Sequence, residues 1–171
     1  KKIDISDVLL NKGHCLLKQS YNSKELKEAK INADGFGISW ILNDNKPKMY
    51  KNVMPIWSDI FLEDIAKSIK SDLIIGNVRS ATPGIGYGIN NVHPFIIDNL
   101  MFSHNGYIGN FTSQTSFKLK QYLNADYLKY LRGSSDSELI FTLIAQNINL
   151  GLSIKDSILK IFKIIKNNTS N

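Results

Sequence analysis

Residues 35–53 read GFGISWILNDNKPKMYKNV, and their pattern indicates which fold class to expect. Two runs rich in β-branched and aromatic residues, 35–42 and 47–53, are separated by the turn signal Asn43-Asp44-Asn45. Strand-forming runs around a short polar turn are typical of a β-hairpin. Two antiparallel strands are therefore expected here.

Other strands and helices are expected downstream of this hairpin. They are a helix over 59–70 capped by Ser58 or Asp59, a buried strand over 73–78, a second hairpin over 95–97 and 100–103 around Asp98-Asn99, and helices over 136–149 and 154–165. The pairs Ser135/Glu138 and Ser153/Asp156 have the spacing of helix N-caps. Lysines 155, 160, 163 and 166 predict a solvated basic face on a last helix that docks on the core, and the alternative is a helix that binds a membrane surface or a partner. Because the strands precede helices that flank them, a layered α+β fold is expected.

The composition is that of an ordinary globular domain. The chain has 171 residues, of which 43% are hydrophobic and 21% charged, and a single domain over 1–171 is expected. Neither a membrane-length apolar run nor a secretory signal is present, so a cytoplasmic protein without a membrane partner is predicted. The single cysteine, Cys15, excludes an internal disulfide, and no metal or cofactor is expected.

The net charge of +6 does not indicate a nucleic-acid partner. Of the 21 basic residues, 19 are lysines scattered along the chain, without a basic block or a stripe of alternating basic and aromatic residues. The expected partner is a small-molecule substrate, and the oligomeric state is left open.

Arg79 and Asp136 are candidate substrate-binding residues. Arg79 follows the predicted strand over 73–78, and a guanidinium holds a carboxylate through two parallel hydrogen bonds. Its alternative is a partly buried ion pair. Asp136 lies in the first turn of its predicted helix, where the dipole keeps a carboxylate ionised and able to hold an ammonium group. Its alternative is an ordinary helix-favouring acid.

The segment His104-Asn105-Gly106 follows a predicted strand and is a candidate oxyanion hole. Asn105 offers a side-chain amide and Gly106 an unobstructed backbone N–H, although an Asn-Gly turn is the alternative. His93 is either a substrate-facing group or a hydrogen-bonded structural one. The glycine-rich stretch 83–88 lacks the third glycine of a dinucleotide-binding motif, and it indicates a loop that folds over a ligand.

Five motifs resemble, in their order and their exact neighbours, those of the class II glutamine amidotransferases. The likeness runs from His14 to about Phe141 and is closest to the stand-alone branch that includes the ergothioneine-pathway γ-glutamyl hydrolases. The motifs are Asn32-Ala33-Asp34-Gly35-Phe36-Gly37-Ile38-Ser39-Trp40, Val78-Arg79-Ser80-Ala81-Thr82, Asn91-Val92-His93-Pro94-Phe95, Phe102-Ser103-His104-Asn105-Gly106-Tyr107-Ile108 and Gly133-Ser134-Ser135-Asp136-Ser137-Glu138.

This resemblance implies the αββα four-layer sandwich of the N-terminal-nucleophile hydrolases, incomplete at both ends. It implies that Arg79 binds the α-carboxylate of a glutamyl substrate and that Asp136 binds its α-ammonium. Asn105 and Gly106 are then the oxyanion hole, and the loop from Thr82 to Gly88 closes over the γ-glutamyl group. The motif residues Asp34 and Gly35 are expected to support the site.

The mechanism so implied uses a cysteine at the mature N-terminus, and here the sequence departs from the family pattern. Lys1 occupies that end, while Cys15 lies in a segment that follows the nucleophile in the family, so Cys15 is expected to be a small buried residue. Its alternative is a reactive thiol assisted by His14 or His93. The chain is therefore expected to be a fragment that lacks the nucleophile and does not hydrolyse glutamine as it stands. The alternative is a catalytically silent homologue that binds glutamine or a γ-glutamyl compound as a regulatory or partner module.

Overall fold

The chain forms two compact units, Lys1–Ser103 and His104–Asn171. The computed structural model describes residues 2–23, 31–81 and 86–169. All of the β-strands that it describes belong to the first unit, and the second unit is helical. Antiparallel sheets and helices are both present, which confirms the predicted α+β class. None of the described helices is long and apolar enough to cross a membrane.

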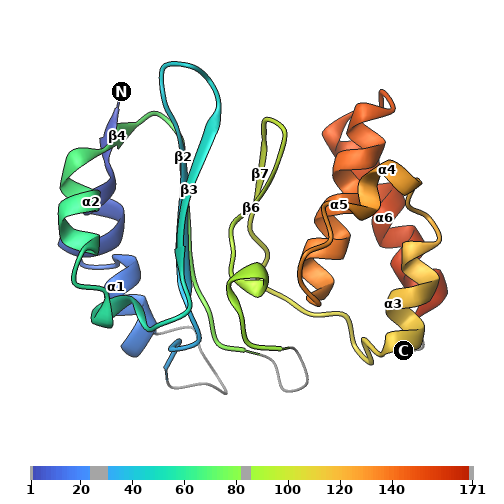
Figure 1. Cartoon of the computed structure of the whole chain (residues 1–171), viewed down its shortest axis with the longest axis horizontal. Helices are drawn as coiled ribbons and strands as arrows, with labels where there is room; N and C mark the ends of the chain where they lie inside the picture. Colours follow the sequence, from blue (N-terminus) through green and yellow to red (C-terminus); the bar gives the residue numbers. More distant parts are fainter. Residues whose placement is uncertain (1, 24–30, 82–85, 170–171) are drawn as a thin grey trace. The chain divides into compact units, whose positions relative to one another are not determined.

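A three-stranded antiparallel sheet lies at the centre of the first unit (Figure 1). Its middle strand is β2 (Phe36–Ile41), flanked by β3 (Pro47–Asn52) and β5 (Ile74–Val78). The aligned pairs of β2 and β3 extend from Phe36 with Asn52 to Ile41 with Pro47, so the two strands pair along their whole length. The first predicted hairpin is therefore confirmed.

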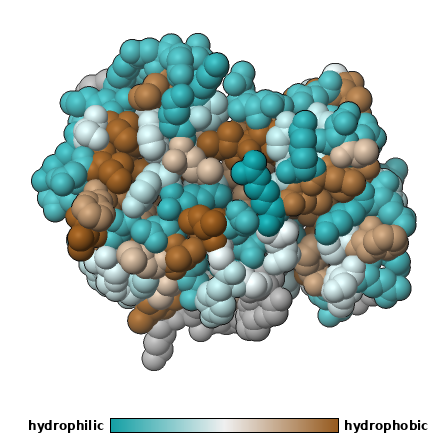
Figure 2. Space-filling model, viewed as in Figure 1, coloured by the Kyte–Doolittle hydropathy of each residue, from teal (hydrophilic) through white to brown (hydrophobic). Residues whose placement is uncertain are grey.

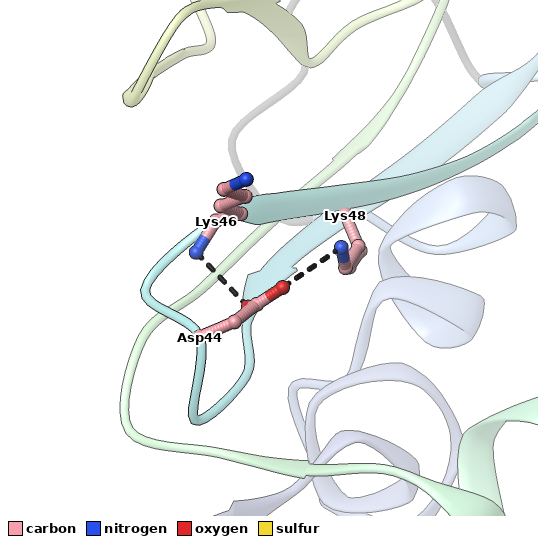
Figure 3. A network of polar contacts seen from close by, with 3 residues as sticks. All are labelled: Asp44, Lys46 and Lys48. Atoms are coloured by element: carbon pink, nitrogen blue, oxygen red, sulfur yellow. Dashed lines mark hydrogen bonds and ion pairs between the residues drawn. The ribbon is translucent and has the colours of Figure 1, made fainter.

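Asp44 holds the turn between β2 and β3 (Figure 3). Its Oδ1 accepts a hydrogen bond from the backbone N–H of Lys46 (3.0 Å), and its Oδ2 lies 3.1 Å from Nζ of Lys48. These two contacts lower the pKa of Asp44. Asn45 has a left-handed backbone (φ 54°), which asparagine tolerates better than most residues. The polar residues between the two strands therefore form the turn that their sequence predicts.

One face of β2 contributes to the main core of the first unit. Side chains alternate between the two faces of a strand, so Phe36, Ile38 and Trp40 share one face. Helices α1 (Leu16–Tyr21) and α2 (Leu62–Ser68) cover that face (Figure 1). The three side chains pack in a buried cluster with Ile5, Leu9, Ile56, Leu62 and Ala66.

The opposite face of β2 lies against the second predicted hairpin, which is also confirmed. This hairpin consists of β6 (Phe95–Ile97) and β7 (Leu100–Phe102). A Cβ on Gly37 would collide with the carbonyl oxygen of His93, just before β6, so this close approach requires glycine. The first unit therefore has three layers in this order: helices α1 and α2, the three-stranded sheet, and the β6–β7 hairpin (Figure 1).

Short elements complete the first unit. Strand β1 (Ile3–Asp4) pairs with β4 (Lys70–Ser71), and the single turns are η1 (Asp7–Asn11), η2 (Ile56–Ser58) and η3 (Ile89–Asn91).

The second unit is built around helix α5. It contains α3 (Ser113–Lys120), α4 (Ala125–Leu128), α5 (Asp136–Asn149) and α6 (Ile154–Asn168), and both α3 and α6 contact α5. The hydroxyls of Ser135 and Ser153 accept hydrogen bonds from the backbone N–H groups of Glu138 and Asp156. Both predicted N-caps, and the two helices that follow them, are therefore confirmed.

The outer face of α6 is more apolar than its lysines predict. Ser157 and Ile161 are buried toward the other helices, but Leu159 and Phe162 are 55% and 59% exposed. Figure 2 shows apolar patches among the polar side chains on the visible face of the molecule. The expected basic face is therefore interrupted by apolar side chains.

Two expectations about the first unit need correction. The helix predicted over 59–70 begins only at Leu62 and ends at Ser68, because the Asp59 carboxylate bonds with β3 residues as well as with the backbone N–H of Phe61. The strand predicted as buried forms as β5, but it lies at the edge of the three-stranded sheet and is mostly half-buried.

Helices α1, α3 and α4 were not predicted, since they are short and have no strong apolar period.

Asp59 joins β3 to the segment that leads into α2. Its Oδ2 accepts hydrogen bonds from Tyr50 Oη (2.6 Å) and Asn52 Nδ2 (2.8 Å), and its Oδ1 accepts one from the Phe61 N–H. Burial acts to raise the pKa of Asp59, but these hydrogen bonds together hold it below its ordinary value. Burial and the Asp59 carboxylate raise the pKa of Tyr50.

Replacing Tyr50 with phenylalanine should lower the free energy of unfolding near pH 7 by about 1 kcal/mol. The folded-state pKa of Asp59 is depressed, so its contribution is present above the unfolded value of about 3.9 and is lost as the pH falls through the folded value. Without the Tyr50 hydroxyl the folded pKa moves back up, and the variant should lose less stability on acidification. Urea unfolding between about pH 3 and 7 measures both effects. Tyr21→Phe, at a half-exposed ring, is the control, and equal acid sensitivity of Tyr50→Phe and the unsubstituted chain would refute this account.

Candidate functional site

Backbone and side-chain hydrogen bonds fix Arg79 at the end of β5. Its N–H donates to the carbonyl oxygen of Gly35 (2.8 Å), and its carbonyl oxygen accepts from the N–H of Asp34 (2.9 Å). The Asp34 Oδ2 in turn accepts from the N–H of Ala81 (2.7 Å). Gly35 has a φ of +110°, and a Cβ there would lie 2.9 Å from the Asn52 carbonyl oxygen. The motif residues Asp34 and Gly35 thus hold the backbone on both sides of Arg79.

The guanidinium of Arg79 is buried with spare hydrogen-bonding capacity. The residue is only 7% exposed, and no described residue provides a hydrogen-bond partner for its Nη1. Burial lowers the pKa of Arg79, while the Asp34 carboxylate and Tyr87 oppose that change. An arginine remains charged even so. A buried cation with an unfilled donor is suited to binding an anion with at least one free oxygen.

Asp136 begins helix α5 and is almost completely buried. It is 2% exposed, and its two carboxylate oxygens accept from different groups. Oδ2 accepts from the backbone N–H of Ile108 (2.6 Å), while Oδ1 accepts from the N–H (2.7 Å) and the hydroxyl (3.2 Å) of Ser137. The carboxylate therefore ties a loop from earlier in the chain to the first turn of α5.

That loop carries Asn105 and Gly106. Both residues are exposed, whereas Ile108 at the end of the loop is buried. At its start, His104 Nδ1 lies 3.0 Å from Ser137 Oγ. The structure thus brings Asn105, Gly106 and Asp136 to one end of α5.

The remaining candidate residues belong to the first unit or lie outside the described residues. His93 is buried and its ring stacks edge-on against Phe95, with 4.8 Å between the ring centres. Thr82 and residues 83–85 of the predicted glycine-rich loop fall outside the described part of the chain. The described residues contain no cluster of three His, Cys, Asp or Glu side chains suited to a metal ion.

Cys15 is buried, as the sequence predicts. It is 2% exposed, and its Sγ donates to the carbonyl oxygen of Leu10 (3.3 Å). It lines a cavity of about 370 Å³ together with Asp7, Val8, Lys12, Gly13, His14, Leu16, Gln19 and Gly76.

Sequence reasoning assigned no role to His104 or Ser137, although both lie inside quoted motifs. Their contact joins positions that are 33 residues apart. No local pattern or spacing predicts such a contact, because it depends on how the loop packs against α5.

Comparisons with known proteins agree with these motifs. The profile of the family described as glutamine amidotransferases class-II matches residues 11–170. A probable glutamine amidotransferase of Saccharomyces cerevisiae is 32% identical over 154 residues, which cover 86% of this chain and 43% of the yeast protein. A gamma-glutamyl-hercynylcysteine sulfoxide hydrolase of Mycobacterium tuberculosis is 28% identical over 107 residues, which cover 63% of this chain and 46% of that protein.

A solved structure gives the same result for the fold. The glutamine aminotransferase class-II domain protein of Silicibacter pomeroyi superposes with a TM-score of 0.62 at 25% identity, covering 80% of this chain and 59% of that one. The matches to the yeast and mycobacterial proteins cover 43% and 46% of those proteins, so the chain spans less than half the length of either. The family profile covers nearly all of the sequence, and the fold agrees with it. The chain belongs to the class II glutamine amidotransferases.

Proposed function

We propose that the parent protein hydrolyses the γ-amide of glutamine or of a related γ-glutamyl compound, with or without transfer of the nitrogen. The observation that carries this proposal is the buried guanidinium of Arg79, whose Nη1 has no partner among the described residues. An α-carboxylate would fill that donor and neutralise the buried charge. Family membership and the names of the two relatives support a γ-glutamyl group as the carrier of that carboxylate.

Asp136, Asn105 and Gly106 are proposed to bind the other polar groups of the same substrate. A carboxylate at position 136 is the complement of the α-ammonium, and Asp136 is fixed in place by three donors. The Asn105 amide and the Gly106 N–H would stabilise the oxyanion formed from the γ-carbonyl oxygen. Thr82 and His93 are proposed as further substrate contacts.

The proposed chemistry uses a cysteine at the mature N-terminus of the parent chain, ahead of Lys1. Its thiolate attacks the γ-carbonyl carbon, and the α-amine of the same residue takes the thiol proton. An α-amine titrates at about 7.7 to 8.0, so it serves as a base near neutral pH. The amine then returns the proton as the C–N bond breaks, ammonia or an amine leaves, and a thioester remains. Water or an acceptor amine cleaves the thioester and releases the thiol.

Cys15 does not fit the role of nucleophile. Its thiol is buried and donates to a backbone carbonyl, and its own nitrogen is part of a peptide bond. A free α-amine is therefore not available beside this sulfur. Cys15 is buried in the first unit, and packing is the only role that we propose for it.

Ammonia or amine release from glutamine and a panel of γ-glutamyl amides tests this function. The parent chain should turn over at least one compound, and exchange of its N-terminal cysteine for serine should abolish turnover. Cys15→Ala should leave turnover intact and is the matched control. The 171-residue polypeptide alone should be inactive. Turnover that is lost on Cys15→Ala would overturn the assignment of the nucleophile, and binding of glutamine without turnover by the parent would instead indicate a silent binding module.

A further inference from the structure

A chain of three polar side chains connects the loop of residues 104–108 to the first turn of α5. His104 Nδ1 lies 3.0 Å from Ser137 Oγ, and the Ser137 hydroxyl donates to Asp136 Oδ1 at 3.2 Å. The other oxygen of Asp136 accepts from the Ile108 N–H at 2.6 Å. The loop is therefore attached to α5 at both of its ends, through two oxygens of one carboxylate.

The donors and acceptors in this chain have one consistent arrangement. A serine hydroxyl has a single proton, and in Ser137 that proton is directed to Asp136. The Ser137 oxygen is then the acceptor for His104, so Nδ1 of His104 carries the proton. Ser137 is 3% exposed, and a polar group buried to that degree is costly to leave without a partner. Each link therefore stabilises the next one.

The imidazole of His104 also lies against the backbone of the proposed oxyanion hole. A Cβ on Gly106 would come within 2.7 Å of His104 Nε2, so glycine at this position leaves space for the ring. The ring thus lies between Gly106 on one side and Ser137 on the other. We therefore expect the position of the ring to influence the backbone that carries the Gly106 N–H.

We propose that His104 and Ser137 are positioning residues, which set the place of the Asn105 and Gly106 donors through Asp136. This proposal rests on the proposed function and adds that the carboxylate for the α-ammonium and the donors for the γ-oxyanion belong to one hydrogen-bonded unit. Asn105 and Gly106 are exposed, and exposed donors stabilise a transition state only when their surroundings hold them in place. The two attachments at His104 and Ile108 perform that task.

Two replacements of His104 separate hydrogen bonding from packing. In His104→Asn, the amide nitrogen takes the place of Nδ1 and keeps the donor to Ser137. In His104→Gln, the amide reaches the place of Nε2, and the bond to Ser137 is lost. In the full-length parent, His104→Gln and Ser137→Ala should lower kcat for ammonia release from glutamine by about 10- to 100-fold with KM within about threefold, whereas His104→Asn should stay within about fivefold of the parent.

Equal losses in His104→Asn and His104→Gln would overturn the proposal, because ring packing alone would then explain them. Full activity of His104→Gln and Ser137→Ala would overturn it as well. Asn105→Ala in the same assay tests the oxyanion hole separately from the positioning role of His104 and Ser137. If Asn105→Ala lowers kcat and His104→Gln does not, the oxyanion hole stands and the positioning role falls.

Amide hydrogen exchange at Ile108 tests the same role without any turnover. Exchange should accelerate by about tenfold or more in His104→Gln and Ser137→Ala, and should stay near the parent rate in His104→Asn. Unchanged exchange in the first two variants would overturn the positioning role. A parent that turns over no γ-glutamyl amide but shows the expected exchange pattern would overturn the proposed function and leave the positioning role supported.

Discussion

Replacing Arg79 with lysine in the parent chain is expected to lower kcat/KM for glutamine by about 10²- to 10³-fold, mainly through a higher KM. Arg79 is 7% exposed, and its buried Nη1 has no partner among the described residues. Lysine keeps the positive charge but not the planar fork that binds both oxygens of a carboxylate. A substrate contact that is equally strong in the ground state and the transition state affects KM more than kcat.

Arg132→Lys is the matched control for this variant. Arg132 is the other arginine of the chain, and it lies in the second unit shortly before α5. The same chemical change there should leave KM near the parent value. Steady-state kinetics on the three proteins decides the question, and a wild-type KM in Arg79→Lys would remove Arg79 from the substrate site.

Asp136→Asn is expected to lower both activity and stability. The Asp136 carboxylate accepts three hydrogen bonds through two oxygens, whereas an amide offers one oxygen and directs its NH₂ group at a donor. The loss of a hydrogen bond to a buried charged group should lower the free energy of unfolding by about 2 to 3 kcal/mol. Asp136 is proposed to bind the α-ammonium, so loss of this anion, together with displacement of the loop of residues 104–108, should lower kcat/KM by about 100-fold or more.

Chemical unfolding and kinetics on one preparation separate these two effects. Asp126→Asn is the control, since Asp126 is an exposed acid in the first turn of α4. That variant should match the parent in both measurements. If Asp136→Asn were destabilised yet fully active, Asp136 would be a structural anchor for Ile108 and not a substrate contact.

The parts of the fold that the sequence predicts well are those with a local physical cause. Helix α5 occupies Asp136–Asn149, as predicted, because the Ser135 hydroxyl accepts from Glu138 N–H and defines the first turn. The β2–β3 hairpin forms because Asp44 and Asn45 favour the turn that joins two strand-forming runs.

The parts that were missed depend on contacts between distant residues. Asp59 has the sequence signature of a helix cap, but Tyr50 and Asn52 of β3 engage its carboxylate, and the helix starts later. Helix α3 is short and mostly polar and gives little apolar period.

The candidate site also contains residues that local patterns predict and residues whose roles depend on contacts between distant parts of the chain. Arg79 stood out because it follows a strand, and Asp136 because it follows a helix cap, so local patterns were enough to select both. His104 and Ser137 gave no such signal, since their roles depend on a contact between a loop and a helix 33 residues away. Sequence patterns select residues with suitable chemistry, and tertiary packing decides which of them share one network.

A crystal structure of the full-length parent with bound glutamate would show whether Arg79, Asp136, Asn105 and Gly106 bind one substrate. The account predicts the α-carboxylate on the Arg79 guanidinium, the α-ammonium on Asp136 and a γ-carboxylate oxygen at the Asn105 amide and the Gly106 N–H. Glutamate bound elsewhere, or a structure that holds Arg79 on the far side of the molecule from Asp136, would contradict the account.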